Sequence, residues 1–127
     1  MVNLGGATEN DRKKIVITKD SKAFFHNNVD YCVGTGRMGL ALTEEYQEEL
    51  RLVQKEIGFK HIRGHGLFCD DMAIFQTYEE DGKVRVEYNY TYLDRVMDAY
   101  KKVGLRPFLE LGFMPKKLAS GSQTIFY

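Results

Sequence analysis

The residues best placed for chemistry lie in the segment Arg63-Gly64-His65-Gly66, at the expected end of an apolar strand. Function in parallel-strand barrels collects at the carboxyl ends of the strands, and the two flanking glycines leave the imidazole without bulky neighbours. Each residue also has a structural interpretation. Arg63 can form an ion pair with Glu110 on a neighbouring strand, because a buried carboxylate needs a partner, and His65 can bind a nearby backbone group. The residues alone leave both interpretations open.

A second candidate is Gly34-Thr35-Gly36-Arg37-Met38-Gly39, which has the GxGxxG spacing of dinucleotide-binding turns. It follows a short strand and precedes a helix, and Arg63 would suit a 2′-phosphate. However, the strand is weak, no acidic residue ends the next strand, and Thr43, followed by two glutamates, predicts a helix start well beyond the motif. We favour a tight turn at the top of a strand and keep an NAD(P)-binding half-domain as the alternative.

Metal and redox chemistry have little support in the sequence. Asp70-Asp71 could be a metal-binding pair, but such residues more often fix the start of a loop through side-chain to backbone hydrogen bonds. Cys32 and Cys69 form neither a metal-binding pattern nor a CxxC motif. We expect reduced thiols near strand ends in a cytoplasmic protein, and no metal site.

Two consecutive units would position these residues, each consisting of an amphipathic helix, one glycine, an apolar strand and a polar tip. Such a repeat predicts parallel strands that are adjacent and in chain order. A closed (β/α)₈ barrel needs roughly 250 residues, so we expect an α/β fold that is part of such a barrel. The expected elements are strands at 31–33, 59–63 and 105–113 and helices at 43–57 and 91–103.

The segment 74–90 predicts a β-hairpin inserted between a strand and the next helix. Its apolar residues flank Glu80-Asp81-Gly82, and Asp-Gly is a strong signal for a tight turn. Residues 1–30 form a separate extension in which Ile15-Val16-Ile17-Thr18 predicts one short strand, a candidate for an accessory β-sandwich. Residues 31–127 would then form the barrel part.

The composition excludes several classes of partner. Eighteen basic residues balance eighteen acidic ones, so we expect neither nucleic acid nor an anionic membrane as a partner. No apolar run approaches the ~18 residues of a membrane span, and residues 1–19 lack the apolar region of a signal peptide. The chain is rich in aromatic residues, with eight tyrosines and eight phenylalanines. Such residues fill cores more often than they line sugar sites.

Three separated segments resemble glycoside hydrolase family 39, and above all its bacterial β-xylosidases. They keep their order and spacing at 32–42, 59–67 and 106–115, the last followed by 118–121 and 123–124. His61 stands where the family more often has a tyrosine. The resemblance covers nearly everything from Tyr31 to Tyr127, whereas residues 1–30 match poorly.

The resemblance implies a retaining glycosidase on a (β/α)₈ barrel, with two catalytic glutamates about 5 Å apart. The acid/base glutamate of the family sits in an Asn-Glu-Pro motif after the fourth strand, and the nucleophile comes later. This sequence contains no Asn-Glu-Pro, so we expect it to be an amino-terminal fragment that lacks both catalytic residues and is inactive alone. The full-length enzyme would bind xylose or xylo-oligosaccharide and act on short β-1,4-xylosides, without a metal or organic cofactor.

Three residues carry over from the family to this chain. His65 matches a histidine that binds sugar hydroxyls in the −1 subsite, and Arg63 matches an arginine beside the nucleophile. Phe126 lies in a segment that borders the sugar site.

The uncovered edge of the third strand is a candidate for self-association. A non-catalytic sugar-binding or interaction module remains a further alternative.

Overall fold

A three-stranded parallel sheet forms the centre of the structure, a computed structural model that describes residues 15–16, 19 and 26–122. Its strands, in spatial order, are β1 (Cys32–Arg37), β2 (His61–His65) and β5 (Arg106–Leu109). Both neighbouring pairs are parallel. The prediction of parallel strands that are adjacent and in chain order is confirmed, and the fold class is α/β.

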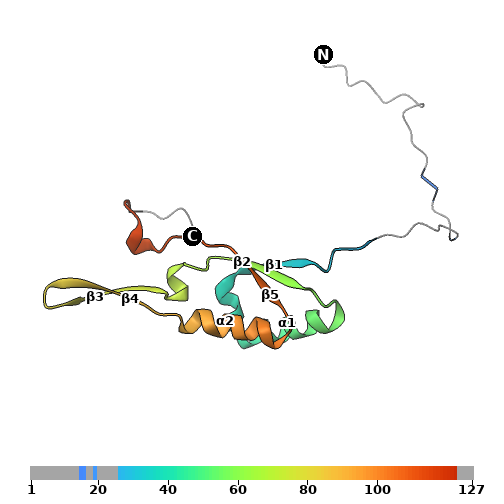
Figure 1. The fold of residues 1–127 in the computed structure, drawn as a ribbon, viewed down its shortest axis with the longest axis horizontal. Helices are drawn as coiled ribbons and strands as arrows, with labels where there is room; N and C mark the ends of the chain where they lie inside the picture. The colour runs from blue at the N-terminus through green and yellow to red at the C-terminus, as the bar shows by residue number, and fades with distance from the viewer. Residues whose placement is uncertain (1–14, 17–18, 20–25, 123–127) are drawn as a thin grey trace, which may run out of the picture.

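Two helices, α1 (Glu44–Glu56) and α2 (Thr91–Lys102), lie on the same side of this sheet (Figure 1). Each helix belongs to the crossover between two neighbouring parallel strands, which cannot be joined by a tight turn. Residues of both helices, of β2 and of the connecting segments form one buried cluster, which excludes water from this side. The cluster comprises Met38, Ala41, Leu50, Ile62, Leu67, Met72, Ile74, Val96, Tyr100 and Leu105.

Both helices end as the sequence predicts. Gly58 and Gly104 follow them with φ of +74° and +76°, in the left-handed region that glycine adopts without strain. Thr43 precedes α1 as predicted, but its hydroxyl donates to the Leu40 carbonyl at 2.9 Å and caps no helix N–H. Among the described residues, no helix is long and apolar enough to cross a membrane.

The carboxyl ends of β1 and β2 differ from prediction. β1 continues through Gly34 and Gly36 to Arg37, where we predicted a tight turn, and β2 begins at His61 and continues to His65. Arg37 pairs with His65 across the sheet. Hydrogen bonds to a neighbouring strand therefore keep these glycine-rich tips extended, although glycine lowers their local strand propensity.

β5 is shorter than predicted. It spans Arg106–Leu109, whereas the sequence predicted a strand over 105–113. Leu109 pairs with Gly64, one residue before β2 ends. Among the described residues, β5 has no other neighbouring strand, so residues 110–113 have no ladder to continue. An apolar run alone does not make a strand without a partner.

The predicted hairpin is confirmed as β3 (Phe75–Glu80) and β4 (Lys83–Tyr88), which pair antiparallel. Asp81 and Gly82 form its turn with φ of +52° and +70°, as a two-residue type I′ turn requires. The hairpin projects away from the sheet and helices (Figure 1).

The short strand predicted at 15–18 in the amino-terminal extension stays a prediction, because only half of it is described. Ile15 and Val16 have no strand conformation. Ile17 and Thr18 lie outside the described residues.

Replacing Gly64 by alanine is expected to lower stability by about 1–3 kcal/mol, the usual cost of overfilling a packed core. A Cβ at this position would lie 3.0 Å from Cγ2 of Thr35 and 3.4 Å from Sδ of the buried Met38. Gly34→Ala is the matched control, because a Cβ on this β1 glycine meets nothing within 4 Å. Thermal melts of both variants test this, and equal midpoints would contradict the packing argument.

Candidate functional site

The two faces of β2 have different surroundings. Ile62 and Gly64 are buried on the helix side, whereas Arg63 is exposed and His65 is half-buried. Alternate residues of a strand point to opposite faces, so Arg63 and His65 share the face that neither α1 nor α2 covers. We predicted that the backbone leaves the strand at Gly64. This prediction is wrong, and the continuing strand is what places both side chains together.

Arg63 is held by an ion pair between its Nη2 atom and Oε1 of Glu110. The Glu110 side chain is 26% exposed and that of Arg63 57%. The structural interpretation of Arg63 is therefore confirmed as a contact. The ion pair links the end of β2 to the residue that follows β5, and it fixes where the guanidinium lies on the uncovered face.

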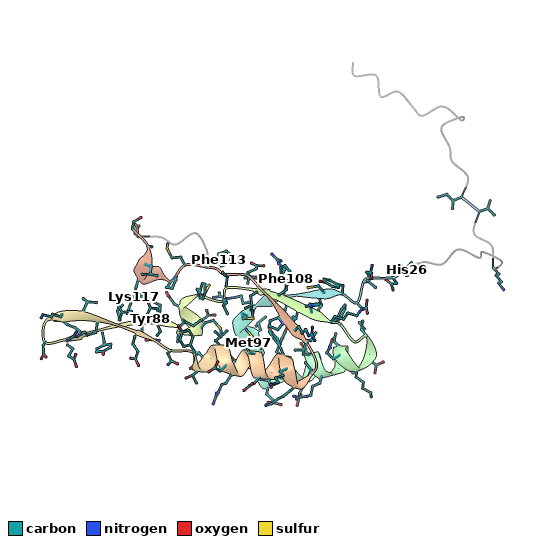
Figure 2. All side chains as sticks on the ribbon, viewed as in Figure 1. His26, Tyr88, Met97, Phe108, Phe113 and Lys117 are labelled. Carbon is teal, nitrogen blue, oxygen red and sulfur yellow. The ribbon has the colours of Figure 1, made fainter. Side chains whose placement is uncertain are left out.

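His65 contacts Phe113, with ring centroids 6.1 Å apart and ring planes inclined by 56°. The loop after β2 is tied to the chain after β5 by the N–H of Phe68, which donates to the Gly112 carbonyl at 3.0 Å. Figure 2 shows Phe108 and Phe113 on the side of the sheet away from Met97 of α2. A histidine and an aromatic ring therefore lie together at the carboxyl ends of the strands.

Arg37, the last residue of β1, forms an ion pair with the loop that follows β2. Its Nη2 atom lies 3.0 Å from Oδ2 of Asp71, while Oδ1 of Asp70 accepts a hydrogen bond from the Lys116 N–H at 3.1 Å. The two carboxylates thus serve different partners. Among the described residues, no group of three histidine, cysteine or acidic side chains is arranged to hold a metal ion.

The GxGxxG segment does not form a dinucleotide-binding turn. Gly34 and Gly36 lie inside β1, a 3₁₀ helix follows at Met38–Leu42, and α1 starts only at Glu44. A dinucleotide site needs the glycines in the turn itself, so that the helix N-terminus faces the pyrophosphate. The favoured tight turn and the cofactor alternative both assumed a chain reversal at Gly34, which the extended strand replaces.

Two further predictions concern single residues. Cys32 and Cys69 are both free, as predicted. Phe126, predicted to border a sugar site, lies outside the described residues.

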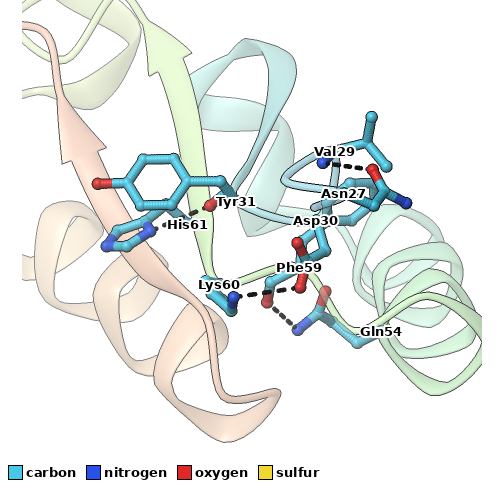
Figure 3. Close-up of polar contacts among 8 residues, drawn as sticks. All are labelled: Asn27, Val29, Asp30, Tyr31, Gln54, Phe59, Lys60 and His61. Carbon is cyan, nitrogen blue, oxygen red and sulfur yellow. Dashed lines mark hydrogen bonds and ion pairs between the residues drawn. The ribbon is translucent and has the colours of Figure 1, made fainter. Parts of the chain in front are cut away.

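The sequence did not predict a cluster at the opposite, amino-terminal ends of the strands (Figure 3). His61 packs on Tyr31 with ring centroids 4.7 Å apart, and its Nδ1 lies 3.0 Å from the Tyr31 carbonyl. Lys60 pairs with Asp30 at 3.3 Å. The only sequence signal was His61 itself, as a departure from the tyrosine that the family more often has there. These contacts join residues 30–31 to β2.

A sequence model of glycosyl hydrolases family 39 matches residues 13–127. The chain belongs to this family. All described strands and helices lie within the matched range, so the segment that carries Arg63 and His65 is family 39 sequence.

The similar proteins are two β-xylosidases and one GH39 enzyme. The β-xylosidase of Geobacillus stearothermophilus is 51% identical over 115 residues, 91% of this chain and 23% of the relative. A monomeric β-xylosidase from Caulobacter crescentus CB15 is 36% identical with a TM-score of 0.67, covering 77% of this chain and 19% of that chain. The GH39 enzyme from Xanthomonas axonopodis pv. citri is 37% identical with a TM-score of 0.63, covering 77% and 19%. The chain thus spans about a quarter or less of each relative's length.

Proposed function

We propose that this chain forms the amino-terminal part of a retaining β-xylosidase-like glycosidase on a (β/α)₈ barrel. The observation that carries the proposal is the position of Arg63 and His65, on the uncovered face at the carboxyl end of β2. In a barrel of this kind the helices lie outside, and the opposite face of each strand lines the interior, where function collects at the carboxyl ends. The 51% identity to a β-xylosidase supports the substrate class, short β-1,4-xylosides.

In this proposal, His65 holds the sugar. Its ring is half-buried and rests against Phe113, so few orientations of the imidazole are open. One ring nitrogen can then exchange a hydrogen bond with a sugar hydroxyl, a contact worth roughly 1–3 kcal/mol when it tightens in the transition state. Phe126 would border the same sugar.

Arg63 supports the nucleophile in this proposal. Its guanidinium has five N–H donors, and the contact with Glu110 is made through Nη2. The remaining donors can serve a second carboxylate, and a nearby cation keeps such a carboxylate ionised at neutral pH. Glu110 then acts as a positioning residue for Arg63 and not as a catalyst.

A chimera tests the proposal, in which this chain replaces the matching 115 residues of the Geobacillus stearothermophilus enzyme. The chimera is expected to hydrolyse an aryl β-xyloside. His65→Ala in the chimera is expected to lower kcat/KM by about 10- to 100-fold, because a hydrogen bond to the sugar is lost.

His61→Ala is the matched control, since His61 lies on the same strand and face but at the amino end. It is expected to leave kcat/KM within a factor of about 2 of the chimera. Full activity in the His65 variant, together with a lower melting temperature, would show that His65 is structural.

Arg63→Ala in the chimera is expected to lower kcat by more than the His65 change and to move the acidic limb of the pH–rate profile upward. Removing a cation raises the pKa of a neighbouring carboxylate, so the nucleophile would become protonated at a higher pH. The profile of kcat/KM from pH 4 to 8 measures this. An unchanged acidic limb would remove Arg63 from its role beside the nucleophile.

A further inference from the structure

The outer edge of the hairpin is open to solvent. Every residue of β4 is exposed, with Val84 at 75%, Val86 at 51% and Tyr88 at 61%. Within residues 26–122, only β3 pairs with β4. A two-stranded hairpin is marginal by itself in water, and an exposed edge strand is a template for pairing with another chain.

The register determines which backbone groups of β4 face outward. The Asn89 N–H donates to the Ile74 carbonyl at 2.8 Å, so hydrogen-bonded pairs recur at every second residue from that point. The intervening residues direct their N–H and C=O groups away from the partner strand. On β4 these are Val84, Val86 and Tyr88.

Within the described residues, the outer edge of β3 accepts a hydrogen bond from a side chain, whereas the outer edge of β4 has no neighbouring strand. Lys117 Nζ donates to the Thr77 carbonyl on the β3 edge at 3.1 Å. Figure 2 shows Lys117 beside the hairpin, which also carries Tyr88. A new strand would therefore add to β4 and not to β3.

We propose that β4 pairs antiparallel with β4 of a second copy of this chain, about a two-fold axis through Val86. The two hairpins then form one four-stranded sheet. Val86 faces Val86 of the second copy, and Val84 faces Tyr88 of the second copy, so that about six backbone hydrogen bonds close the edge. This surface is separate from the uncovered β5 edge and from the proposed sugar site.

The charged side chains on the other face of the hairpin favour the register with Val86 on the axis, and they favour a second copy of this chain as the partner. With Val86 on the axis, Arg85 faces Glu87 of the second copy, and Glu87 faces Arg85 of the second copy. A shift by two residues toward the turn would place Arg85 opposite Arg85, between two Lys83–Glu87 pairs, and a shift the other way would place Glu87 opposite Glu87. Like charges directly opposite are destabilising, and only the register with Val86 on the axis has no such pair among these residues. Self-complementarity under a two-fold axis is the mark of an isologous interface between identical chains.

The proposal depends on the residues of this β4 strand and not on family membership, since the Caulobacter crescentus relative is monomeric. It is also independent of the proposed glycosidase function. The pairing can therefore fail while the enzyme assignment stands, and the reverse also holds.

Cysteine cross-linking of the full chain tests the register. Val86→Cys places two thiols on the axis with Cα atoms about 5.5 Å apart, within the range of a disulfide. Val84→Cys is the matched control, because its thiols would be four pairing positions apart. Under a mild oxidant, Val86→Cys is expected to give several-fold more covalent dimer than Val84→Cys or the parent, whose Cys32 and Cys69 set the background. Equal yields from Val84→Cys and Val86→Cys would overturn the register.

Charge reversal tests the pairing without new cysteines and with little risk to folding. Arg85→Glu alone, or Glu87→Arg alone, is expected to raise the dimer dissociation constant in sedimentation velocity by roughly 10-fold, since both facing pairs become repulsive. The double variant restores opposite charges and is expected to regain the parent's value. Arg85→Glu also breaks an exposed contact with Glu80 inside the hairpin, and such pairs contribute little. A monomeric parent, or a double variant as weak as the single ones, would refute the pairing, as would dimers that bind through another surface.

Discussion

The chain by itself is expected to release no more product from an aryl β-xyloside than a buffer blank. A retaining glycosidase needs an acid/base carboxylate and a nucleophilic carboxylate about 5 Å apart. General acid–base assistance alone contributes about 10²–10⁴-fold, and enzymes reach 10⁶-fold or more in total. The sequence lacks the Asn-Glu-Pro motif that would carry the acid/base glutamate, and the resemblance to the family implies that the nucleophile lies in a later segment.

Two carboxylates near the carboxyl ends of the strands are held in ion pairs with arginines. Glu110 pairs with Arg63, and Asp71 pairs with Arg37. Glu87 lies on the exposed β4 strand of the hairpin. The assay compares chain, chimera and blank at equal protein concentration. Turnover that survives repurification and disappears in Glu110→Gln would show that Glu110 is a catalyst and that our assignment is wrong.

The order and type of the elements could be predicted from the sequence because they depend on local patterns. Helical spacing, two terminal glycines and an Asp-Gly turn each act within a few residues, and each was confirmed. The lengths of the strands could not be predicted in the same way. β1 and β2 continue through glycines because Arg37 and His65 pair across the sheet, and β5 stops where β2 ends. Strand limits are decided by neighbours and not by propensity.

In the candidate site too, some contacts could be predicted from the sequence and others depend on tertiary neighbours. That Arg63, His65 and Phe113 would meet follows from the parallel order of the strands, and the ion pair with Glu110 follows from the need of a carboxylate for a partner. The partner of Arg37 could not be foreseen, because Asp71 reaches it through a 3₁₀ helix, Asp70–Met72, that has no strong sequence signal. Tyr31 and His61 likewise meet only once the strands are in register.

Replacing Tyr100 by alanine is expected to be the most destabilising single change in this fold. Tyr100 is fully buried on α2, in the same cluster as Ile62 and Leu105, and its hydroxyl donates to Sδ of Met38 at 3.4 Å. Removing a buried aromatic side chain costs about 3–5 kcal/mol, through lost burial and the cavity left behind. Whole domains have only about 5–15 kcal/mol of stability.

Tyr92→Ala is the matched control, because Tyr92 lies on the same helix and its side chain is 41% exposed. It is expected to cost about 1 kcal/mol or less. Urea or thermal unfolding followed by circular dichroism separates the two variants. Similar losses from both would show that α2 is not anchored through Tyr100.

Tyr100→Phe removes only the hydroxyl and is expected to change how the stability of the fold depends on pH. Burial, and secondarily the neighbouring Tyr46, raises the pKa of Tyr100 above its ordinary value. The folded chain therefore keeps the phenol protonated at a pH where the unfolded chain, with a pKa of about 10, releases its proton. The stabilisation is complete below pH about 10 and is lost progressively as the pH rises above it. Tyr100→Phe has no such proton, so its stability is expected to fall less steeply than the parent's between about pH 9.5 and 11. Parallel curves would indicate that the phenol ionises in the folded chain as it does in the unfolded one.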